Sequence, residues 1–283
     1  MQVRSPSGVV MRERKSPFVR LFNKTPAGVC CPHFYELILS NGCPYDCAYC
    51  YLRLTFRGNK GPVMFTNPWE RVRAEIDKSS SGVFSTGELA DSLAVIPPLL
   101  WEAVEYFREQ KHKYLLLTTK SCNIGLFREV KPTPQVIISF SINAPEIAAK
   151  YERLAPPPVA RLRAALELLE LGWRVRIRLD PVVVEGGLEI YRPICREISS
   201  IGVERVTVGT LRQYPGLYRF APDAPRCGLR KALDGRMRYP VSVRAGVYRA
   251  IAEWLGFEPA LCKETDEVWK LLGWQFQGCN CTF

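Results

Sequence analysis

The chain has 283 residues, of which 47% are hydrophobic and 24% are charged, values that are ordinary for a globular protein. They exclude global disorder, collagen-like repeats and coiled coil, and the length fits one α/β barrel-type domain. Two values are unusual: the formal charge is +11, and the number of cysteines is 11. An odd count in a chain of this size argues against a disulfide scaffold and favours metal ligands or reactive thiols in a reducing compartment.

The start of the chain, MQVRSPSGVVMRERK, has no apolar segment typical of a secretory signal, and no stretch approaches 18 uncharged apolar residues. We therefore expect a cytoplasmic protein with no membrane span and no membrane partner. Residues 1–33 carry six Lys or Arg against one Glu, with Pro and Gly among them. They are predicted to form an irregular basic arm.

Six apolar or alternating segments then predict strands, and four amphipathic or well-capped segments between them predict helices. The predicted strands are 34–40, 82–86, 114–119, 135–142, 174–180 and 203–210, and the predicted helices are 68–77, 97–110, 159–171 and 190–201. This alternation is typical of a parallel α/β fold, and both a partial (β/α) barrel and an open doubly wound sheet fit it. The pattern breaks after Gly209, so we expect an α/β body over 34–210 and an appended substrate-facing or capping region over 211–283.

The strongest motif is NGCPYDCAYCYL, which places Cys43, Cys47 and Cys50 in the loop after the first predicted strand. Soft thiolates suit iron–sulfur clusters and zinc. Three thiolates rather than four leave one iron of a [4Fe-4S] cluster free for a small chelating ligand. A structural zinc site with a fourth ligand elsewhere is the alternative, although such sites usually close with paired C-x2-C units and none stands nearby.

This C-x3-C-x2-C spacing in a βα repeat resembles the radical S-adenosylmethionine (SAM) superfamily. The resemblance implies a partial (β/α)6 barrel with a C-terminal extension, a [4Fe-4S] cluster on the three cysteines, and SAM bound to the open iron. It further implies that one electron, from a donor such as flavodoxin or ferredoxin, releases a 5′-deoxyadenosyl radical. That radical abstracts hydrogen from a substrate held in the barrel.

Other strand ends fit the same interpretation. Thr86, Gly87 and Glu88 resemble the Gly-Gly-Glu element of the superfamily, in which Glu88 would accept hydrogen bonds from the SAM ammonium group. Ligands of such sheets bind at the carboxyl ends of strands. Polar side chains at the later strand ends are therefore candidate SAM contacts, or equally strand-end groups bonded within the protein: Lys120, Ser141, Asn143, Arg178 and Asp180.

The segment CAYCYL (47–52) resembles the spore photoproduct lyase family, and the resemblance extends over about residues 34 to 183. Members of that family repair a methylene-bridged thymine dimer in DNA. The resemblance implies that Tyr49 flanks the cluster and SAM and that Tyr51 sits in the radical-relay position. It also implies that Lys120 and Ser141 contact SAM, with Glu88 in place of a family Asp.

One position departs from that family. Where the repair lyase has a cysteine that donates hydrogen to the product radical, this chain has Ser85. A serine O–H bond is too strong for this role, so the usual relay lacks its donor. Cys122, two residues after Lys120, is a candidate replacement, and an inert loop thiol is the alternative.

A second group of cysteines lies near the end of the chain, at Cys262, Cys279 and Cys281. A second iron–sulfur cluster is one interpretation, with Cys30 or Cys31 offering a fourth ligand. The alternatives are a zinc staple that ties down the tail and thiols that bind no metal.

Residues 211–240 combine seven Lys or Arg with Tyr214, Tyr218, Phe220 and Tyr239. Cations for phosphates with rings for bases are typical of nucleic-acid contact. A hairpin with Asp234-Gly235 at its turn is also predicted. A solvated loop in a basic protein is the alternative.

Together these features favour a radical SAM enzyme resembling spore photoproduct lyase that acts on a nucleic acid. A second hypothesis is a radical SAM modification enzyme with an auxiliary cluster, acting on tRNA, a peptide or a small molecule. A third is a zinc-bound, non-catalytic nucleic-acid-binding protein.

Overall fold

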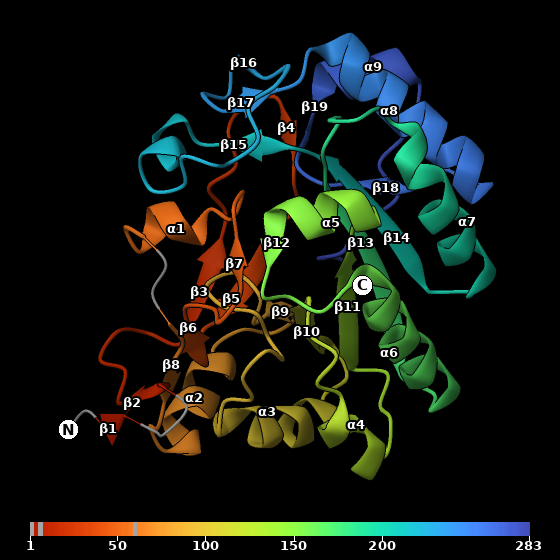
Figure 1. Cartoon of the computed structure of the whole chain (residues 1–283). Helices are drawn as coiled ribbons and strands as arrows, with labels where there is room; N and C mark the ends of the chain where they lie inside the picture. The colour runs from red at the N-terminus through yellow and green to blue at the C-terminus, as the bar shows by residue number, and fades with distance from the viewer. Residues whose placement is uncertain (1–2, 5–7, 59–60) are drawn as a thin grey trace.

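The centre of the computed structural model, which describes residues 3–4, 8–58 and 61–283, is a curled eight-stranded sheet (Figure 1). Neighbouring strands are parallel, except for the antiparallel pair of β3 and β5 at one edge. In spatial order they are β18 (Ala260–Leu261), β14 (Arg205–Thr210), β13 (Arg174–Val182), β11 (Val136–Ile142), β10 (Lys113–Thr119), β9 (Gly82–Ser85), β5 (Phe34–Leu37) and β3 (Val19–Phe22). Six of these are the predicted strands, and the predicted partial barrel is confirmed.

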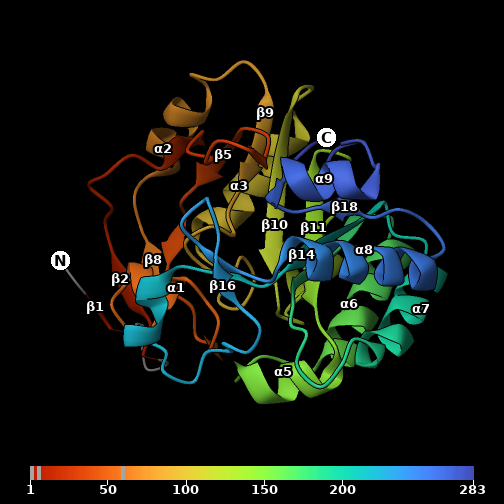
Figure 2. The ribbon, with the colours of Figure 1, turned by 90° about the horizontal axis from the view of Figure 1, so that it is seen from above.

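The four predicted helices are present as α2, α3, α6 and α7, with bounds that differ by one or two residues. The helices are α1 (Leu52–Thr55), α2 (Trp69–Ile76), α3 (Leu99–Arg108), α4 (Gly125–Glu129), α5 (Pro145–Tyr151), α6 (Pro158–Glu170), α7 (Arg192–Ser200), α8 (Val241–Leu255) and α9 (Asp266–Leu272), with 3₁₀ turns at Glu189–Tyr191 and Pro215–Arg219. Helices α6, α7 and α8 lie together beside β11 and β14 in both views (Figures 1 and 2).

The prediction of an irregular arm over residues 1–33 is wrong for four described segments. The segment of β3 pairs with β5 and extends the central sheet, because its backbone satisfies the hydrogen-bonding groups of that edge. Strand β2 (Val10–Arg12) pairs with β1 (Val3–Arg4) and with β8 (Val63–Phe65), and β4 (Val29–Cys30) pairs with β19 (Glu264–Thr265). Residues 1–2 and 5–7 of the predicted arm lie outside the described residues.

Several short strands surround the central sheet. They are β1 (Val3–Arg4), β2 (Val10–Arg12), β8 (Val63–Phe65) and β6 (Ser40–Asn41) in one sheet, β7 (Asp46–Cys47) with β12 (Glu152–Arg153), β4 (Val29–Cys30) with β19 (Glu264–Thr265), and β15 (Arg212–Gln213), β17 (Met237–Arg238) and β16 (Arg230–Lys231) in another. Strands β16 and β17 form the predicted hairpin, with Gly235 at a φ of 78° in its turn.

The sheet also continues past residue 210, where the sequence pattern breaks. Chain from β14 passes through α8 and returns as β18, which lies parallel to β14. The segment 211–283 therefore contributes a strand and a helix to the body, in addition to the hairpin and the tail.

The two faces of the sheet differ in character, as the period of two in β13 predicts. Val175, Ile177 and Leu179 are buried in the main apolar core against the helices. The alternate residues, such as Arg176 and Arg178, lie on the inner face of the half-barrel. The inner face of β13 is thus polar where its outer face is apolar, whereas Phe34, Val83, Leu116 and Ile137 form an apolar cluster on the neighbouring strands.

The C-terminal tail packs against this inner face, and Figure 1 shows the chain ending beside β11. Ser139 of β11 donates a hydrogen bond to Asn280 (2.6 Å), and the buried Arg176 donates to the carbonyls of Asn280 (2.7 Å) and Thr282 (2.5 Å). The ring of Phe283 stacks on Tyr114 with centroids 5.0 Å apart. These contacts fix the two tail cysteines inside the half-barrel.

Acid is expected to loosen this packing through Glu204, which accepts hydrogen bonds from Arg174 (2.5 Å) and Arg176 (2.7 Å). Burial alone would raise the pKa of Glu204, but the two guanidinium groups lower it by more, and the resulting pKa is about 2. The pKa of a glutamate in the unfolded chain is about 4.3. The contacts of Glu204 with the two arginines therefore stabilise the folded protein at neutral pH, and this contribution is lost as pH falls from about 4.3 to about 2. We expect melting temperatures measured by circular dichroism to fall less over this range in Glu204→Gln than in the wild type, and parallel profiles would contradict this.

Candidate functional site

The carboxyl ends of the parallel strands open onto a cavity of about 440 Å³. Its wall contains most of the predicted site residues, drawn from segments far apart in the sequence. They are Cys43, Cys47, Tyr49, Cys50, Tyr51, Gly87, Glu88, Lys120, Ser141, Arg178, Cys262, Cys279 and Cys281. The position agrees with the general rule that ligands of such sheets bind where the strands end.

The three cysteines of the motif are held by a short turn after β6. Cys47 lies in β7 and pairs with Glu152 of β12, and the Cys50 N–H donates a hydrogen bond to the Cys47 carbonyl at 3.2 Å. Burial raises the pKa of Cys47 to about 12 and also raises the pKa values of Cys43 and Cys50. Buried thiolates require a compensating positive charge, so this donor set fits a soft, positively charged metal group. Among the described residues, no three His, Cys, Asp or Glu side chains gather closely enough to hold a single metal ion.

A buried carboxylate, Glu152, organises the wall beside the motif. Its side chain accepts a hydrogen bond from the Tyr49 hydroxyl and pairs with Arg161 (2.6 Å) and, more loosely, with Lys120 (3.8 Å). The Lys120 ammonium also lies 5.8 Å from the centre of the Tyr49 ring. Burial raises the pKa of Glu152, but Lys120 and Arg161 outweigh this and hold it below the ordinary value. The carboxylate is therefore charged and fixes both Tyr49 and Lys120.

Asp91 plays a similar part at the end of β10. Its carboxylate accepts hydrogen bonds from the Thr119 hydroxyl and the Lys120 N–H, both at 2.6 Å, and also from the backbone of Leu93 (3.0 Å). Glu152 and Asp91 were not predicted from the sequence. Neither follows a predicted strand, so only the tertiary structure reveals their position.

Gly87, Glu88 and Tyr51 form another part of the wall. A Cβ atom on Gly87 would come within 2.6 Å of the Thr118 Cβ, so only glycine permits this close approach of the segment to β10. The Tyr51 hydroxyl donates a hydrogen bond to the Glu88 carbonyl, and Tyr51 remains 40% exposed. The predicted relay residue therefore lies directly beside the predicted ammonium-binding segment.

Three predicted site residues are not among the described residues that line the cavity. The Thr86 hydroxyl is buried and donates to Ser92 (2.7 Å). Asn143 is buried and bonds to the Pro181 carbonyl (3.1 Å) and the Tyr191 hydroxyl (2.7 Å), joining the ends of β11 and β13. Cys122 packs against the main core instead. Thr86 and Asn143 thus fit the alternative of strand-end groups bonded within the protein.

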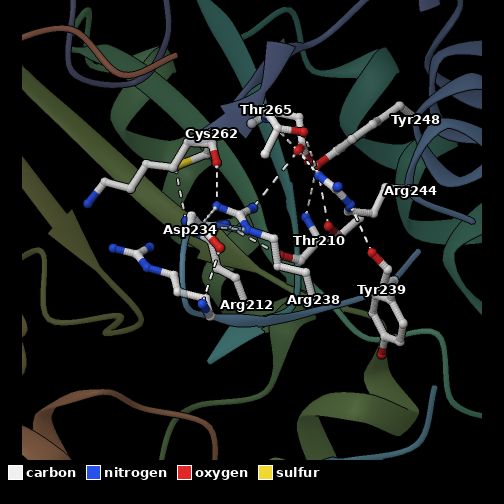
Figure 3. A network of polar contacts seen from close by, with 12 residues as sticks. Thr210, Arg212, Asp234, Arg238, Tyr239, Arg244, Tyr248, Cys262 and Thr265 are labelled. Carbon is white, nitrogen blue, oxygen red and sulfur yellow. Dashed lines mark hydrogen bonds and ion pairs between the residues drawn. The ribbon is translucent and has the colours of Figure 1, made fainter. Parts of the chain in front are cut away.

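The basic aromatic stretch divides into buried and exposed residues. Arg212 pairs with Asp180 (2.9 Å), Arg238 pairs with Asp234 (2.7 Å), and Tyr239 is 5% exposed (Figure 3). The expectation that Arg238 and Tyr239 face a nucleic acid is wrong, because both are buried in the polar network of Figure 3. Arg212 is half-buried and also lines the cavity. The remaining cations of the stretch are exposed or half-buried: Arg219, Arg226, Arg230, Lys231 and Arg236.

No family model matches the chain. It is 26% identical over 181 residues to a spore photoproduct lyase of Clostridium acetobutylicum, covering 58% of this chain and 52% of that protein. A second spore photoproduct lyase, from a Geobacillus species, is 20% identical over 204 residues, covering 68% of this chain and 58% of that protein. This chain is a relative of the spore photoproduct lyases. It spans little more than half the length of these two relatives.

The fold of this spore photoproduct lyase relative agrees with solved structures. A spore photoproduct lyase complexed with dinucleoside spore photoproduct has a TM-score of 0.73 at 17% identity, covering 89% of this chain and 81% of that one. SuiB of Streptococcus suis bound to S-adenosylmethionine has a TM-score of 0.55 at 14% identity, covering 83% of this chain and 51% of that one. In the described residues, no helix is long and apolar enough to cross a membrane.

Proposed function

We propose that this chain is a radical SAM enzyme of the spore photoproduct lyase type that acts on a nucleic acid. The observation that carries the proposal is the convergence of Cys43, Cys47 and Cys50 with Glu88 and Lys120 on one cavity. The three thiols are the residues that would hold a [4Fe-4S] cluster, with SAM beside it. When bound and reduced, that cluster supplies the electron that cleaves SAM to methionine and a 5′-deoxyadenosyl radical.

The protein's own residues would bind and orient SAM. Glu88 provides a carboxylate for the ammonium group, and Lys120 provides an ammonium for the carboxylate, as charge-assisted contacts. Lys120 is held in place by Glu152 through its side chain and by Asp91 through its backbone. Ser141 at the end of β11 offers a hydroxyl, and the centre of the Tyr49 ring lies 5.8 Å from the Lys120 ammonium. An electron donor such as flavodoxin or ferredoxin would reduce the cluster before SAM is cleaved.

The relatives support a nucleic-acid substrate. One solved spore photoproduct lyase contains both AdoMet and dinucleoside spore photoproduct, and it has a TM-score of 0.72 with this chain. In this chain, however, Ser85 is buried in β9 at 1% exposure and is not among the described residues that line the cavity. Hydrogen return to a product radical therefore requires another group, and Tyr51 is the exposed candidate on the cavity wall.

The β16–β17 hairpin supplies the nucleic-acid surface of this proposal. Its tip carries Leu233, which is 99% exposed, between the cations Lys231 and Arg236. An apolar side chain at the tip of a basic hairpin is suited to entering a base step. The turn is fixed because Asp234 pairs with the buried Arg238 at 2.7 Å. Arg236 of the hairpin donates a hydrogen bond to the Tyr214 hydroxyl at 3.0 Å, and both residues line the cavity, so the hairpin adjoins the cavity.

The double substitution Arg230→Ala with Lys231→Ala is expected to weaken DNA binding and to make it less dependent on salt. Each lost phosphate contact reduces the slope of log K against log salt concentration by about 1. Fluorescence anisotropy with labelled DNA at several salt concentrations measures both effects. Lys111→Ala is a matched control, because Lys111 is an exposed cation just before the amino end of β10. The cavity lies at the other, carboxyl ends of the strands. An unchanged slope in the double variant would count against the hairpin surface.

The proposed function is tested by anaerobic SAM cleavage assayed with and without DNA, UV-irradiated DNA, and RNA. We expect 5′-deoxyadenosine formation, stimulation by irradiated DNA, and conversion of spore photoproduct back to two adjacent thymines. Stimulation by a peptide alone would favour the modification-enzyme hypothesis, for which the SuiB fold match with a bound precursor peptide (TM-score 0.56) is the specific support. If metal analysis of the protein finds zinc and no iron, the radical SAM hypothesis is excluded.

A further inference from the structure

A second group of thiols faces the same cavity and takes no part in the chemistry proposed above. Cys31 follows β4, Cys262 follows β18, and Cys279 and Cys281 lie in the tail. All four line the cavity. Cys31 lies more than 200 residues before the other three in the sequence, and the fold therefore brings four soft ligands from three segments to one wall.

Regular structure fixes the first two thiols. Strand β4 pairs with β19, with Cys30 opposite Glu264, so Cys31 is carried next to the strand that follows Cys262. The Cys262 N–H donates a hydrogen bond to the Val208 carbonyl at 2.8 Å, which continues the pairing of β18 with β14. Both thiols are thus positioned by backbone hydrogen bonds of the central fold.

The tail thiols are held by the half-buried Arg205 and by the Thr282 hydroxyl. Arg205 donates a hydrogen bond to the Cys279 carbonyl at 2.7 Å, and the Cys279 N–H donates to the Thr282 hydroxyl at 2.9 Å. The thiols of Cys279 and Cys281 are within hydrogen-bonding reach of each other. Cys279 also lies within electrostatic range of Cys31 and Cys262, and all four thiols line the same cavity.

Two guanidinium groups stand at this group of thiols. Arg212 donates to the Cys262 sulfur at 3.2 Å and Arg178 donates to it at 3.6 Å. The Arg178 Nε–H is buried and has no hydrogen-bond partner among the described residues. Figure 3 shows Arg212 and Cys262 together in the polar network. N–H···S hydrogen bonds and nearby cations are what stabilises the negative charge of a thiolate-ligated cluster.

We propose that Cys31, Cys262, Cys279 and Cys281 bind a second iron–sulfur cluster, separate from the one at Cys43, Cys47 and Cys50. Four thiolates complete the ligand set of such a cluster, in contrast to the three of the first motif. Structural zinc sites are closed by their ligands, whereas these four thiols line an open cavity of about 440 Å³. The proposal goes beyond the proposed function, because metal binding here does not require SAM chemistry.

The test counts iron in full-length protein reconstituted anaerobically with iron and sulfide. If the second cluster is a [4Fe-4S] cluster, we expect about eight irons in the wild type and about four in a Cys43→Ala, Cys47→Ala, Cys50→Ala variant. Adding Cys262→Ser and Cys279→Ser to that variant is expected to remove the remainder. Cys30→Ser is the matched control, because Cys30 neighbours Cys31 but lies outside the four-thiol group, and it is expected to keep all the iron.

A wild type with about four irons, all lost in the triple variant, would overturn the second cluster. So would zinc in place of iron at the second site. If a variant fails to fold, electron paramagnetic resonance of the reduced wild type decides: two cluster signals are expected, with SAM perturbing one, and a single signal contradicts the proposal. The two proposals can fail separately. If the triple variant keeps iron but the wild type does not cleave SAM, the second cluster is supported and the proposed function is not.

Discussion

Replacing Cys50 with alanine is expected to remove about four irons per chain and to abolish reductive cleavage of SAM. The Cys50 side chain is half-buried on the cavity wall, and desolvation raises the pKa of its thiol, so a positively charged metal group would favour the thiolate. Two remaining thiolates cannot hold a cluster that needs three. Iron and sulfide analysis with visible absorbance measures the first effect, and chromatography of 5′-deoxyadenosine measures the second.

Cys227→Ala is the matched control for this experiment. Cys227 is an exposed thiol and is not among the described residues that line the cavity. Its variant is expected to keep wild-type iron and wild-type SAM cleavage. Full SAM cleavage by Cys50→Ala would contradict the assignment of the motif.

Replacing Glu152 with glutamine is expected to lower the free energy of unfolding by about 3–5 kcal/mol. The substitution leaves the fully buried Arg161 without its anionic partner, and an uncompensated buried charge is strongly destabilising. It also releases Lys120 from the cavity wall. Urea denaturation followed by circular dichroism measures the change.

Glu167→Gln provides the comparison, because Glu167 pairs with Arg128 on the surface, with both side chains well exposed. Surface pairs of this kind are screened by water and salt, so this variant is expected to stay close to the wild type. Equal losses in the two variants would show that the buried network around Glu152 has no special role in stability.

Most of the central sheet is predictable because parallel strands buried on both faces have continuous apolar sequences. All seven residues of β11 are buried, and its sequence, VIISFSI, shows this directly. The short strands are different. Strand β18 has two residues and β7 has two, and segments of this length have no period that a sequence pattern can reveal. Tertiary pairing determines their structure.

The candidate site was predictable where sequence spacing alone places chemistry. The C-x3-C-x2-C motif, Gly87-Glu88 and the strand-end residues Lys120 and Arg178 all line the cavity. Glu152 was not predictable, because it reaches the site through a two-residue strand pairing with Cys47. The pairing of Arg212 with Asp180 was also missed, since a local count of charges does not show which cations have acidic partners far away in the sequence.

Strand β13 illustrates both outcomes. The alternation in its sequence predicts a strand and agrees with the burial of Val175 and Ile177 in the core. The alternation gave no indication that Arg176 would be fully buried, because its partners are carbonyls of the tail about 100 residues later. Contacts of such long range depend on the completed fold.

The central claim is that this cavity cleaves SAM through a cluster on Cys43, Cys47 and Cys50. The most direct measurement is the formation of 5′-deoxyadenosine by anaerobically reconstituted, chemically reduced wild-type protein supplied with SAM. We predict that 5′-deoxyadenosine forms in proportion to the iron bound and increases when irradiated DNA is added. Protein that carries a full complement of iron and binds SAM, yet forms no 5′-deoxyadenosine with or without DNA, would contradict the account.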